Sequence, residues 1–153
     1  MEENNKRPPF PQANDLEKVV QIINVPNEET VLNDDALGAY LDGITSRQAR
    51  YYIAAAKYLG ILDANKHFTE IGNKLRSMNT YMQRVEIIRL VLSDEVFGTV
   101  FITEKVLGMK LSREDVAEII EKAYPDYCDA IYPRRAQTVT SWISWINAQF
   151  NQQ

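Results

Sequence analysis

Three basic side chains in the middle of the chain, Arg47, Arg50 and Lys57, recur at helical spacing. At about 100° per residue they fall on one side of a helix, with Tyr51 and Ala54 between them. Arginine can donate two hydrogen bonds to guanine O6 and N7, and a small residue lets a helix backbone approach a thymine methyl group. The pattern is therefore typical of a helix that lies in the major groove of duplex DNA. Tyr51 is expected to lie partly in the core and partly in contact with DNA.

The opposite side of this predicted helix is apolar and predicts contact with the core. Its members are Ala49, Tyr52, Ile53, Ala56 and Leu59. Ser46, at the helix start, is placed to meet a phosphate together with free backbone N–H groups, and Lys66 adds a further backbone contact from the turn that follows. A solvated basic face on an ordinary core helix has the same pattern, so both interpretations stay open.

The net charge of −4 at first argues against a nucleic-acid partner. The segment 44–76, however, contains six lysines and arginines and only two acids, whereas the rest of the chain has a net charge of −8. A phosphate responds to charge within about 8–10 Å, a Debye length at moderate salt. This basic segment in an acidic chain is the local signal expected of a polyanion-binding surface.

Cap residues predict the helices around this segment. Asn14, with Glu17 three residues later, predicts a capping box at the start of a helix that ends before Pro26. Asn33 predicts the cap of a short helix that reaches Leu41, and two aspartates follow it in the first turn.

The basic helix itself is predicted from its own boundary residues. Gly43 makes the turn before it, and Thr45 with Gln48 predicts a second capping box. The helix then extends to Leu59, where Gly60 stops it. A short helix, a turn and a basic helix in this order predict a helix-turn-helix.

Two short apolar pairs follow the basic helix. Ile61–Leu62 and His67–Phe68 flank a polar turn, which predicts a minimal β-hairpin. Thr69 then predicts the cap of a helix that reaches about Met78. The fold class expected is mainly α, with a winged helix-turn-helix over 14–78 whose wing is this hairpin.

The remaining segments complete the predicted organisation. Residues 1–13 contain three prolines and many polar groups, and we expect them to form a flexible tail. Residues 79–153 are expected to form a helical subdomain packed on the winged unit. Its predicted helices cover 81–92, 95–107, 112–123 and 134–150, and Ser112 is expected to cap the third of them.

Arg134 and Arg135 open the last predicted helix, where cations oppose the helix dipole. Such a placement is explained either by a phosphate, as a secondary DNA contact, or by a salt bridge to Asp126 or Asp129. On the same helix, Trp145 lies about 60° from the apolar stripe and is expected at the core edge.

Three segments together suggest a family resemblance. SRQARYYIAAAKYLGIL, then FTEIGNKL, then RRAQTVTSWISWI resembles the winged-helix regions that accompany nuclease domains in type II restriction enzymes and related defence proteins. The likeness covers about residues 33–146. It implies duplex binding through the helix carrying Arg47 and Arg50, with the wing near Lys66 on the backbone or in the minor groove.

No combination of residues predicts catalysis. Asp126 after Pro125 is not followed by the acid-x-lysine pair that a restriction-type Mg²⁺ site needs. His67 and Cys128 are the only members of their types, which excludes a zinc site and an internal disulfide. We expect no metal, no cofactor, no membrane contact and a reducing cytoplasm.

The function expected is therefore non-catalytic binding of double-stranded DNA, as the recognition part of a restriction or defence protein. A nuclease or other protein partner, or a homodimer, is compatible with this function. The alternative is a winged helix that binds an acidic protein partner or oligomerises, without contacting DNA.

Overall fold

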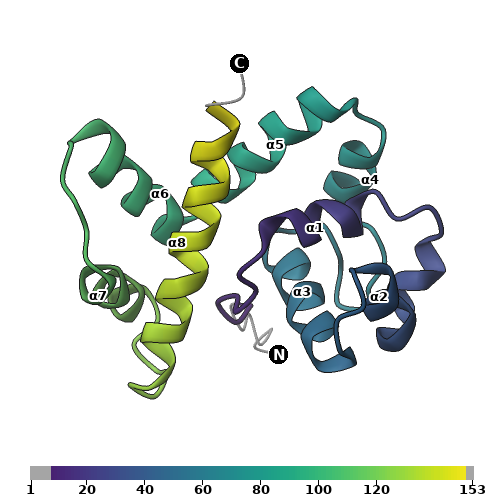
Figure 1. Ribbon diagram of the computed structural model, residues 1–153, viewed down its shortest axis with the longest axis horizontal. Coiled ribbons are helices and arrows are strands. Elements are labelled where there is room, and N and C mark those ends of the chain that lie inside the picture. The colour runs from purple at the N-terminus through teal and green to yellow at the C-terminus, as the bar shows by residue number, and fades with distance from the viewer. Residues whose placement is uncertain (1–7, 151–153) are drawn as a thin grey trace, which may run out of the picture.

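The computed structural model describes residues 8–150, without the side chain of Phe150. Within this range the chain forms eight α-helices, with no strand, which confirms the mainly helical class (Figure 1). The α-helices are α1 (Leu16–Ile23), α2 (Asp34–Tyr40), α3 (Ser46–Tyr58), α4 (Glu70–Arg76), α5 (Thr80–Ser93), α6 (Glu95–Phe101), α7 (Arg113–Ala123) and α8 (Ile131–Phe150), with a 3-10 helix η1 (Glu28–Leu32) and a π-helical segment η2 (Ile102–Val106).

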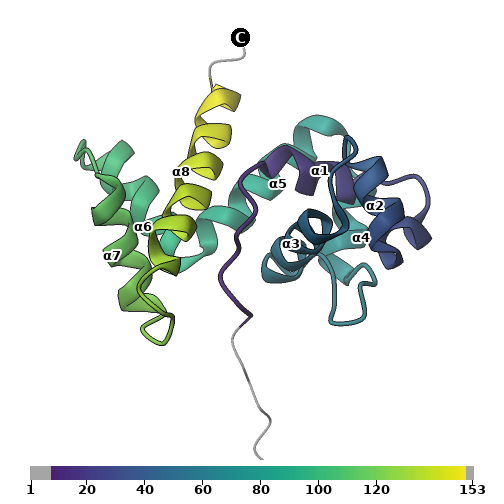
Figure 2. The same cartoon turned by 60° about the horizontal axis from the view of Figure 1, so that its bottom comes forward.

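Two groups of helices lie on either side of the molecule, and α5 connects them (Figures 1 and 2). We call α1 to α4 the N-lobe and α6 to α8 the C-lobe. In the N-lobe α2 packs on α3, and in the C-lobe α7 packs along α8. The division into units 14–78 and 79–153 stays a prediction, because α5 contacts elements of both lobes.

The caps predicted for four helices are confirmed. The side chains of Asn33 and Thr69 each accept a backbone N–H in the first turn of α2 and α4, respectively. Thr45 and Gln48 form the complete capping box at the start of α3. Ser112 forms a second box at the start of α7, with Asp115 as its partner. These interactions are local, so a short sequence window contains all of their atoms.

Two glycines fix the connections of α3. Gly60 has a φ of +76°, in the left-handed region that ends many helices. Gly38 of α2 lies so close to the turn before α3 that an added Cβ would overlap the carbonyl oxygen of Ile44. The glycine therefore allows α2 to approach the start of α3 as a helix-turn-helix requires.

Two predicted helix starts are wrong. Asp15, and not Asn14, caps α1, because its carboxylate accepts the backbone N–H of Glu17. The last helix begins at Ile131, three residues before the predicted Arg134. Pro133 lies in its first turn, where a proline is tolerated because no intrahelical N–H bond is lost.

The predicted β-hairpin wing is not confirmed. Between α3 and α4 a single antiparallel bridge pairs Leu62 with Phe68. The Asp63 carboxylate accepts backbone N–H groups from Asn65 at 2.8 Å and His67 at 3.0 Å. Because the turn satisfies its own donors in this way, it closes as a compact loop and extends no ladder of strand pairs.

The predicted flexible tail is wrong where the structure describes it. Phe10 and Ala13 are buried, with 1% and 2% of their surfaces exposed. The Phe10 ring stacks on Phe97 at 5.4 Å and meets Tyr58 and Tyr124 edge-on. Residues 8–15 thus form a strap between the lobes, and residues 1–7 of the predicted tail lie outside the described residues.

Hydrogen bonds attach the strap to both lobes. Trp142 of α8 donates its indole N–H to the carbonyl of Ala13 at 2.6 Å. The Tyr127 hydroxyl accepts the backbone N–H of Phe10 at 2.9 Å, and the Tyr52 hydroxyl accepts that of Asp15 at 3.2 Å. The strap therefore belongs to the core that joins the lobes.

None of the helices found between residues 8 and 150 combines the length and the apolar character needed to cross a membrane.

Candidate nucleic-acid interface

The helix α3 has the two faces that its sequence predicts. Ala49, Ile53 and Ala56 are buried against the N-lobe core, with at most 3% of their surfaces exposed. Arg47 and Arg50 are exposed on the other side. This part of the prediction is confirmed, because the 3.6-residue period determines which residues share a face once one side is buried.

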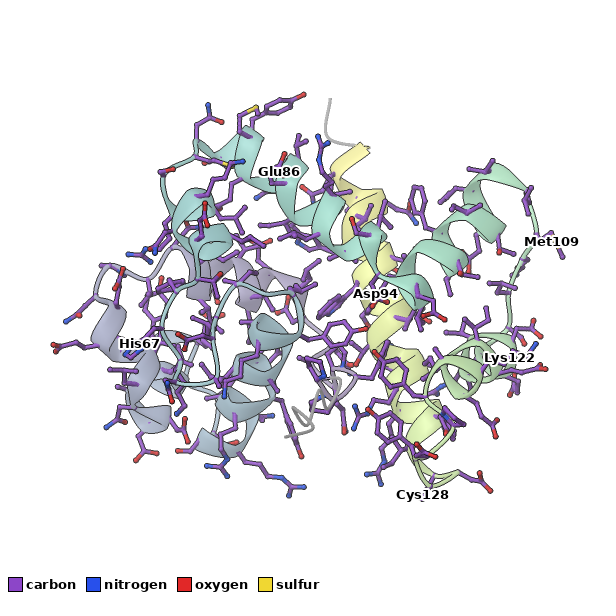
Figure 3. All side chains as sticks on the ribbon, turned by 180° about the vertical axis from the view of Figure 1, so that it is seen from behind. His67, Glu86, Asp94, Met109, Lys122 and Cys128 are labelled. Carbon is purple, nitrogen blue, oxygen red and sulfur yellow. The ribbon has the colours of Figure 1, made fainter. Side chains whose placement is uncertain are left out.

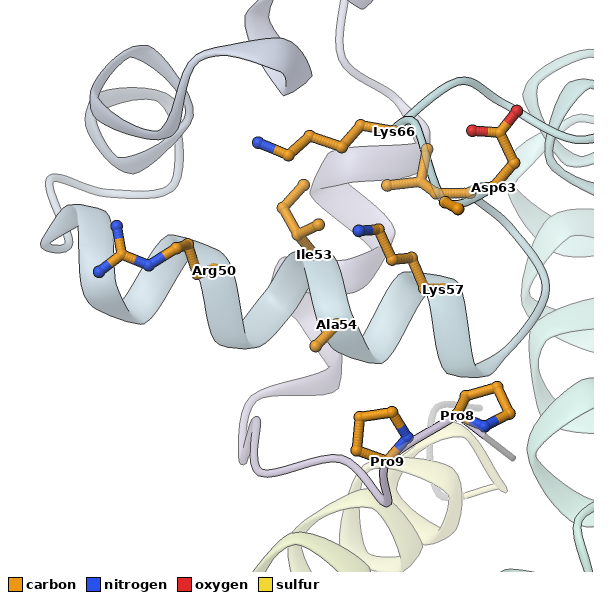
Figure 4. A pocket seen from close by; sticks show the side chains of 10 residues that line it. Pro8, Pro9, Arg50, Ile53, Ala54, Lys57, Asp63 and Lys66 are labelled. Atoms are coloured by element: carbon orange, nitrogen blue, oxygen red, sulfur yellow. The ribbon is translucent and has the colours of Figure 1, made fainter. Parts of the chain in front are cut away.

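The outer face of α3 forms the floor of a groove with a volume of about 480 Å³ (Figure 4). One wall is the strap, through Pro8 and Pro9, and the other is the turn between α3 and α4. The complete lining, which we call the basic groove, is Pro8, Pro9, Arg50, Ile53, Ala54, Lys57, Leu62, Asp63, Ala64 and Lys66.

The structure thus brings together three of the predicted contact residues, Arg50, Lys57 and Lys66. Lys66 reaches the groove from a left-handed backbone conformation with a φ of +65° in the compact turn. Arg47 lies on the same face of α3 but does not line the groove. The interface therefore has a walled part around Lys57 and an open part at the first turn of α3.

One carboxylate, that of Asp34, holds two of these cations. Its oxygens accept hydrogen bonds from Arg50 at 3.3 Å and from Lys66 at 3.1 Å. Burial by itself raises the pKa of the Asp34 carboxyl, but the hydrogen bonds from Lys66 and Arg50 outweigh this effect and lower it below its usual range. Asp34 therefore stays charged at neutral pH and offsets part of the positive charge.

The remaining predicted contacts on α3 also have partners within the protein. Arg47 donates from Nε to the Tyr51 hydroxyl at 3.1 Å and lies over the Tyr51 ring. Ser46 donates its hydroxyl hydrogen to the carboxylate of Asp35. A bound phosphate would have to replace the Ser46 contact, whereas the Arg47 guanidinium keeps donors available beside the tyrosine.

Arg134 and Arg135 do not line the basic groove. Within residues 8–149 neither forms an ion pair with Asp126 or Asp129, so the predicted salt bridge is wrong. Arg135 instead lies over the Tyr127 ring at 5.0 Å, and its buried Nε has no hydrogen-bond partner there. The helix starts earlier than predicted, which moves both arginines out of its unpaired first turn.

Sequence inspection missed Asp34 and the two strap prolines as parts of the site. Asp34 was interpreted as a helix-start charge, which it also is. Its second role depends on which side chains meet once α2 lies against α3, and the predicted helix-turn-helix does not specify that Asp34 reaches Arg50 and Lys66. Pro8 and Pro9 fell in the predicted tail, so nothing placed them beside α3.

No group of three or more His, Cys, Asp or Glu side chains in the described part of the chain is arranged to hold a metal ion. His67 lies in the N-lobe beside Asp63, at 4.0 Å, whereas Cys128 lies at the far end of the C-lobe (Figure 3). The two residues are therefore too widely separated to share a site.

A family model described as "Domain of unknown function (DUF7226)" matches residues 18–151. The chain belongs to this family. The DUF7226 match includes α3 and the turn after it, and it begins two residues after the start of α1. No significant match was found among curated proteins or among solved structures.

Proposed function

We propose that this DUF7226 protein binds double-stranded DNA through the outer face of α3. The observation that carries the proposal is the exposed basic face of a helix that follows a tight α2–turn–α3 connection. Arg47 and Tyr51 lie outside the basic groove on this face, next to Arg50 of the groove lining. Lys57 and Lys66 lie beside them and would contact phosphates.

Electrostatics favours a polyanion at this surface. The groove lining contains three cations and a single acid, Asp63, whose carboxylate is engaged by its own turn. Asp34 neutralises Arg50 and Lys66 only in part, because one carboxylate faces two cations. A phosphate that approaches Arg50 therefore gains a charge-assisted hydrogen bond and competes with Asp34.

The wider role that we propose follows from the resemblance of this chain to the winged-helix regions of type II restriction enzymes and related defence proteins. It is a non-catalytic recognition module of a cytoplasmic restriction or defence protein, with a winged-helix-like N-lobe. A purified sample is then expected to show no Mg²⁺-dependent nuclease activity of its own. Cleavage of duplex DNA by the isolated chain would contradict this role.

Fluorescence anisotropy with a labelled random duplex tests the DNA proposal, at salt concentrations from about 50 to 200 mM, where phosphate contacts have a large effect on affinity. The double variant Arg47→Ala plus Arg50→Ala removes two contacts. We expect the slope of log K against log salt to become shallower by about 1.8, at about 0.9 per phosphate.

The matched control is Lys105→Ala plus Lys110→Ala, which removes the same two charges from the connection between α6 and α7. The control should bind duplex like the wild type. No binding by the wild type at the lowest salt concentration, or equal losses in both double variants, would contradict the proposal.

A second candidate function, docking of a protein partner or of a second copy, is favoured by an exposed apolar surface on the C-lobe. Val106, Leu107 and Met109 expose 71%, 64% and 56% of their surfaces at and after η2, and Ile102 exposes 52%. Clustered apolar exposure of this kind is typical of interfaces. Sedimentation tests this function by comparing the wild type with the double variant Val106→Ser plus Leu107→Ser. If these residues form an interface, the double variant should sediment with a lower mass than the wild type.

A further inference from the structure

We propose that the basic groove is also a binding site for a small amphipathic anion, a molecule with an apolar body and one anionic group. Nothing in the DNA proposal requires such a ligand. The shape, the apolar floor and the charge of the groove together support such a ligand.

The floor of the groove is apolar and continuous with the core. Ile53 and Leu62 have 3% and 2% of their surfaces exposed, and Ala54 lies beside them. Pro8 and Pro9 form an apolar wall opposite the turn that carries Ala64. At about 480 Å³ the groove lies within the 300–1,000 Å³ that is usual for small-molecule sites. The apolar surface that an aromatic or branched aliphatic body would remove from water belongs to the exposed Pro8, Pro9 and Ala64 and the half-buried Ala54.

The charge of the lining is suited to an anionic group. In Figure 4 the Lys57 and Lys66 side chains extend toward the region around Ile53, whereas the Asp63 carboxylate points away from their ammonium groups. That carboxylate accepts the backbone N–H groups of His67 and Asn65 in its own turn. The hydrogen bond from His67 is the main cause that lowers the pKa of the Asp63 carboxyl, and the bond from Asn65 lowers it further. The only acid of the lining therefore stays ionised and directed outward. Lys66 is paired with Asp34, so Lys57 is the ammonium group of the lining that has no ion pair among the described residues.

The floor and the cations are also arranged in advance. Asp34 does not line the groove but holds Lys66 and Arg50 through its two oxygens. The apolar stems of Lys57 and Lys66 line the groove beside its floor, as is common for lysine. A ligand would therefore find its apolar and cationic contacts within one short span and would order few side chains on binding.

A consequence of this site is regulation of the same surface, and it rests on the proposed function. A bound amphipathic anion would occupy the contacts of Arg50, Lys57 and Lys66 that a duplex needs. The two ligands would therefore exclude each other.

The test uses 8-anilinonaphthalene-1-sulfonate, an aromatic sulfonate whose fluorescence rises in apolar surroundings, with uncharged N-phenyl-1-naphthylamine as its neutral counterpart. We expect the sulfonate to bind saturably at one site. The neutral dye should bind at least about tenfold more weakly, which corresponds to about 1.36 kcal/mol of binding free energy. Amide chemical-shift mapping should place the sulfonate at Ile53, Ala54 and Leu62. Shifts confined to residues 102–109, or equal affinity for both dyes, would overturn the proposal.

Two variants sharpen the test. Lys57→Glu reverses a surface charge and is expected to weaken the sulfonate about tenfold, whereas Lys105→Glu, its matched control in the C-lobe, should leave binding unchanged. Ala54→Trp fills the groove and should abolish binding while the circular dichroism stays helical. Equal effects of Lys57→Glu and Lys105→Glu would overturn the site.

Titration of labelled duplex into the sulfonate complex separates the two proposals. Loss of sulfonate fluorescence as duplex binds supports the shared surface. Sulfonate binding without any duplex binding leaves the groove site standing and rejects the DNA function. Duplex binding without sulfonate binding rejects the groove site alone.

Discussion

Two grooves of similar size and opposite charge lie in different lobes of this protein. The basic groove on α3 has a volume of about 480 Å³, and a second groove along α7 and the start of α8 has about 570 Å³. The second, which we call the acidic groove, is lined by Glu114, Ala117, Glu118, Glu121, Asp129, Tyr132 and Pro133. The net charge of −4 therefore hides two local charges of opposite sign.

The opposite charges of the two grooves show how an acidic protein can present a locally basic surface to a polyanion. Duplex DNA would be attracted to α3 and repelled by the four carboxylates of the acidic groove, so charge would select the orientation of approach. The floors differ as well, because Ile53 and Leu62 are buried beneath the basic groove.

We expect the largest loss of stability from a change in the strap, which packs between the two lobes that carry the grooves. Phe10 is 1% exposed and packs between aromatic rings of the two lobes. Phe10→Ala should lower the free energy of unfolding by about 3–5 kcal/mol, because it leaves a cavity there. Urea denaturation measures the change, with exposed Pro8→Ala as a control expected to alter stability by less than about 0.5 kcal/mol. Similar small changes in both variants would show that the lobes hold together without the strap.

Alkaline pH should weaken the junction of the lobes. The Tyr58 hydroxyl donates to the carboxylate of Asp94 and lies 3.0 Å from the Tyr124 hydroxyl. Burial raises the pKa of Tyr58, and the hydrogen bonds to Asp94 and Tyr124 raise it further. Tyrosine ionises first in the unfolded chain, so this stabilisation is complete below about pH 10 and falls by up to about 1.4 kcal/mol per pH unit above it.

Urea denaturation between pH 8 and 11 measures that dependence. Tyr58→Phe should make the alkaline decline shallower than in the wild type by this single group. Tyr81→Phe, which alters a ring that is 75% exposed, should not. An unchanged slope in Tyr58→Phe would mean that Tyr58 ionises equally easily in both states.

A capping box stabilises one helix of each groove, α3 in the basic groove and α7 in the acidic groove. Thr45 begins α3 and Ser112 begins α7. Thr45→Ala and Ser112→Ala should each cost about 1 kcal/mol of stability, because each removes the acceptor of a first-turn N–H group. Since the two sites share no partner, their effects should add within about 0.5 kcal/mol in the double variant, as thermal or urea denaturation can measure. Strong non-additivity would show that the helices fold as one coupled element.

The smallest effect concerns the charge of the basic groove. Asp34→Asn should raise duplex affinity about 1.4- to fivefold, since a solvent-accessible ion pair is worth about 0.2–1 kcal/mol and its loss frees Arg50 and Lys66. Because the pKa of Asp34 is lowered, the wild type keeps this pairing until the pH falls below the usual aspartate range. Asp35→Asn removes the same charge from a residue that hydrogen-bonds Ser46 instead. Equal gains in both variants, measured by anisotropy at fixed salt, would contradict a specific role for Asp34.

Local features of the fold were predicted well, with some exceptions at element ends. The predicted helix 95–107 is α6 up to Phe101, followed by the wider π-helical turn of η2. Trp145 was predicted at a core edge and is half-buried, with its indole N–H donating to Glu17 at 2.8 Å. That partner is distant in the sequence, so only the general position of Trp145 followed from helical spacing.

The sequence by itself determined the helical class, the caps at Asn33, Thr45, Thr69 and Ser112, and the division of α3 into a buried and a basic face. Each of these depends on atoms within about one or two helical turns, which a short window of sequence contains. Only the tertiary structure decided that Phe10 is a core residue, that Asp34 holds Arg50 and Lys66, and that the strap turns a helix face into a groove. These features join segments that are remote in the chain, and their energies arise from burial and charge pairing once the lobes have met.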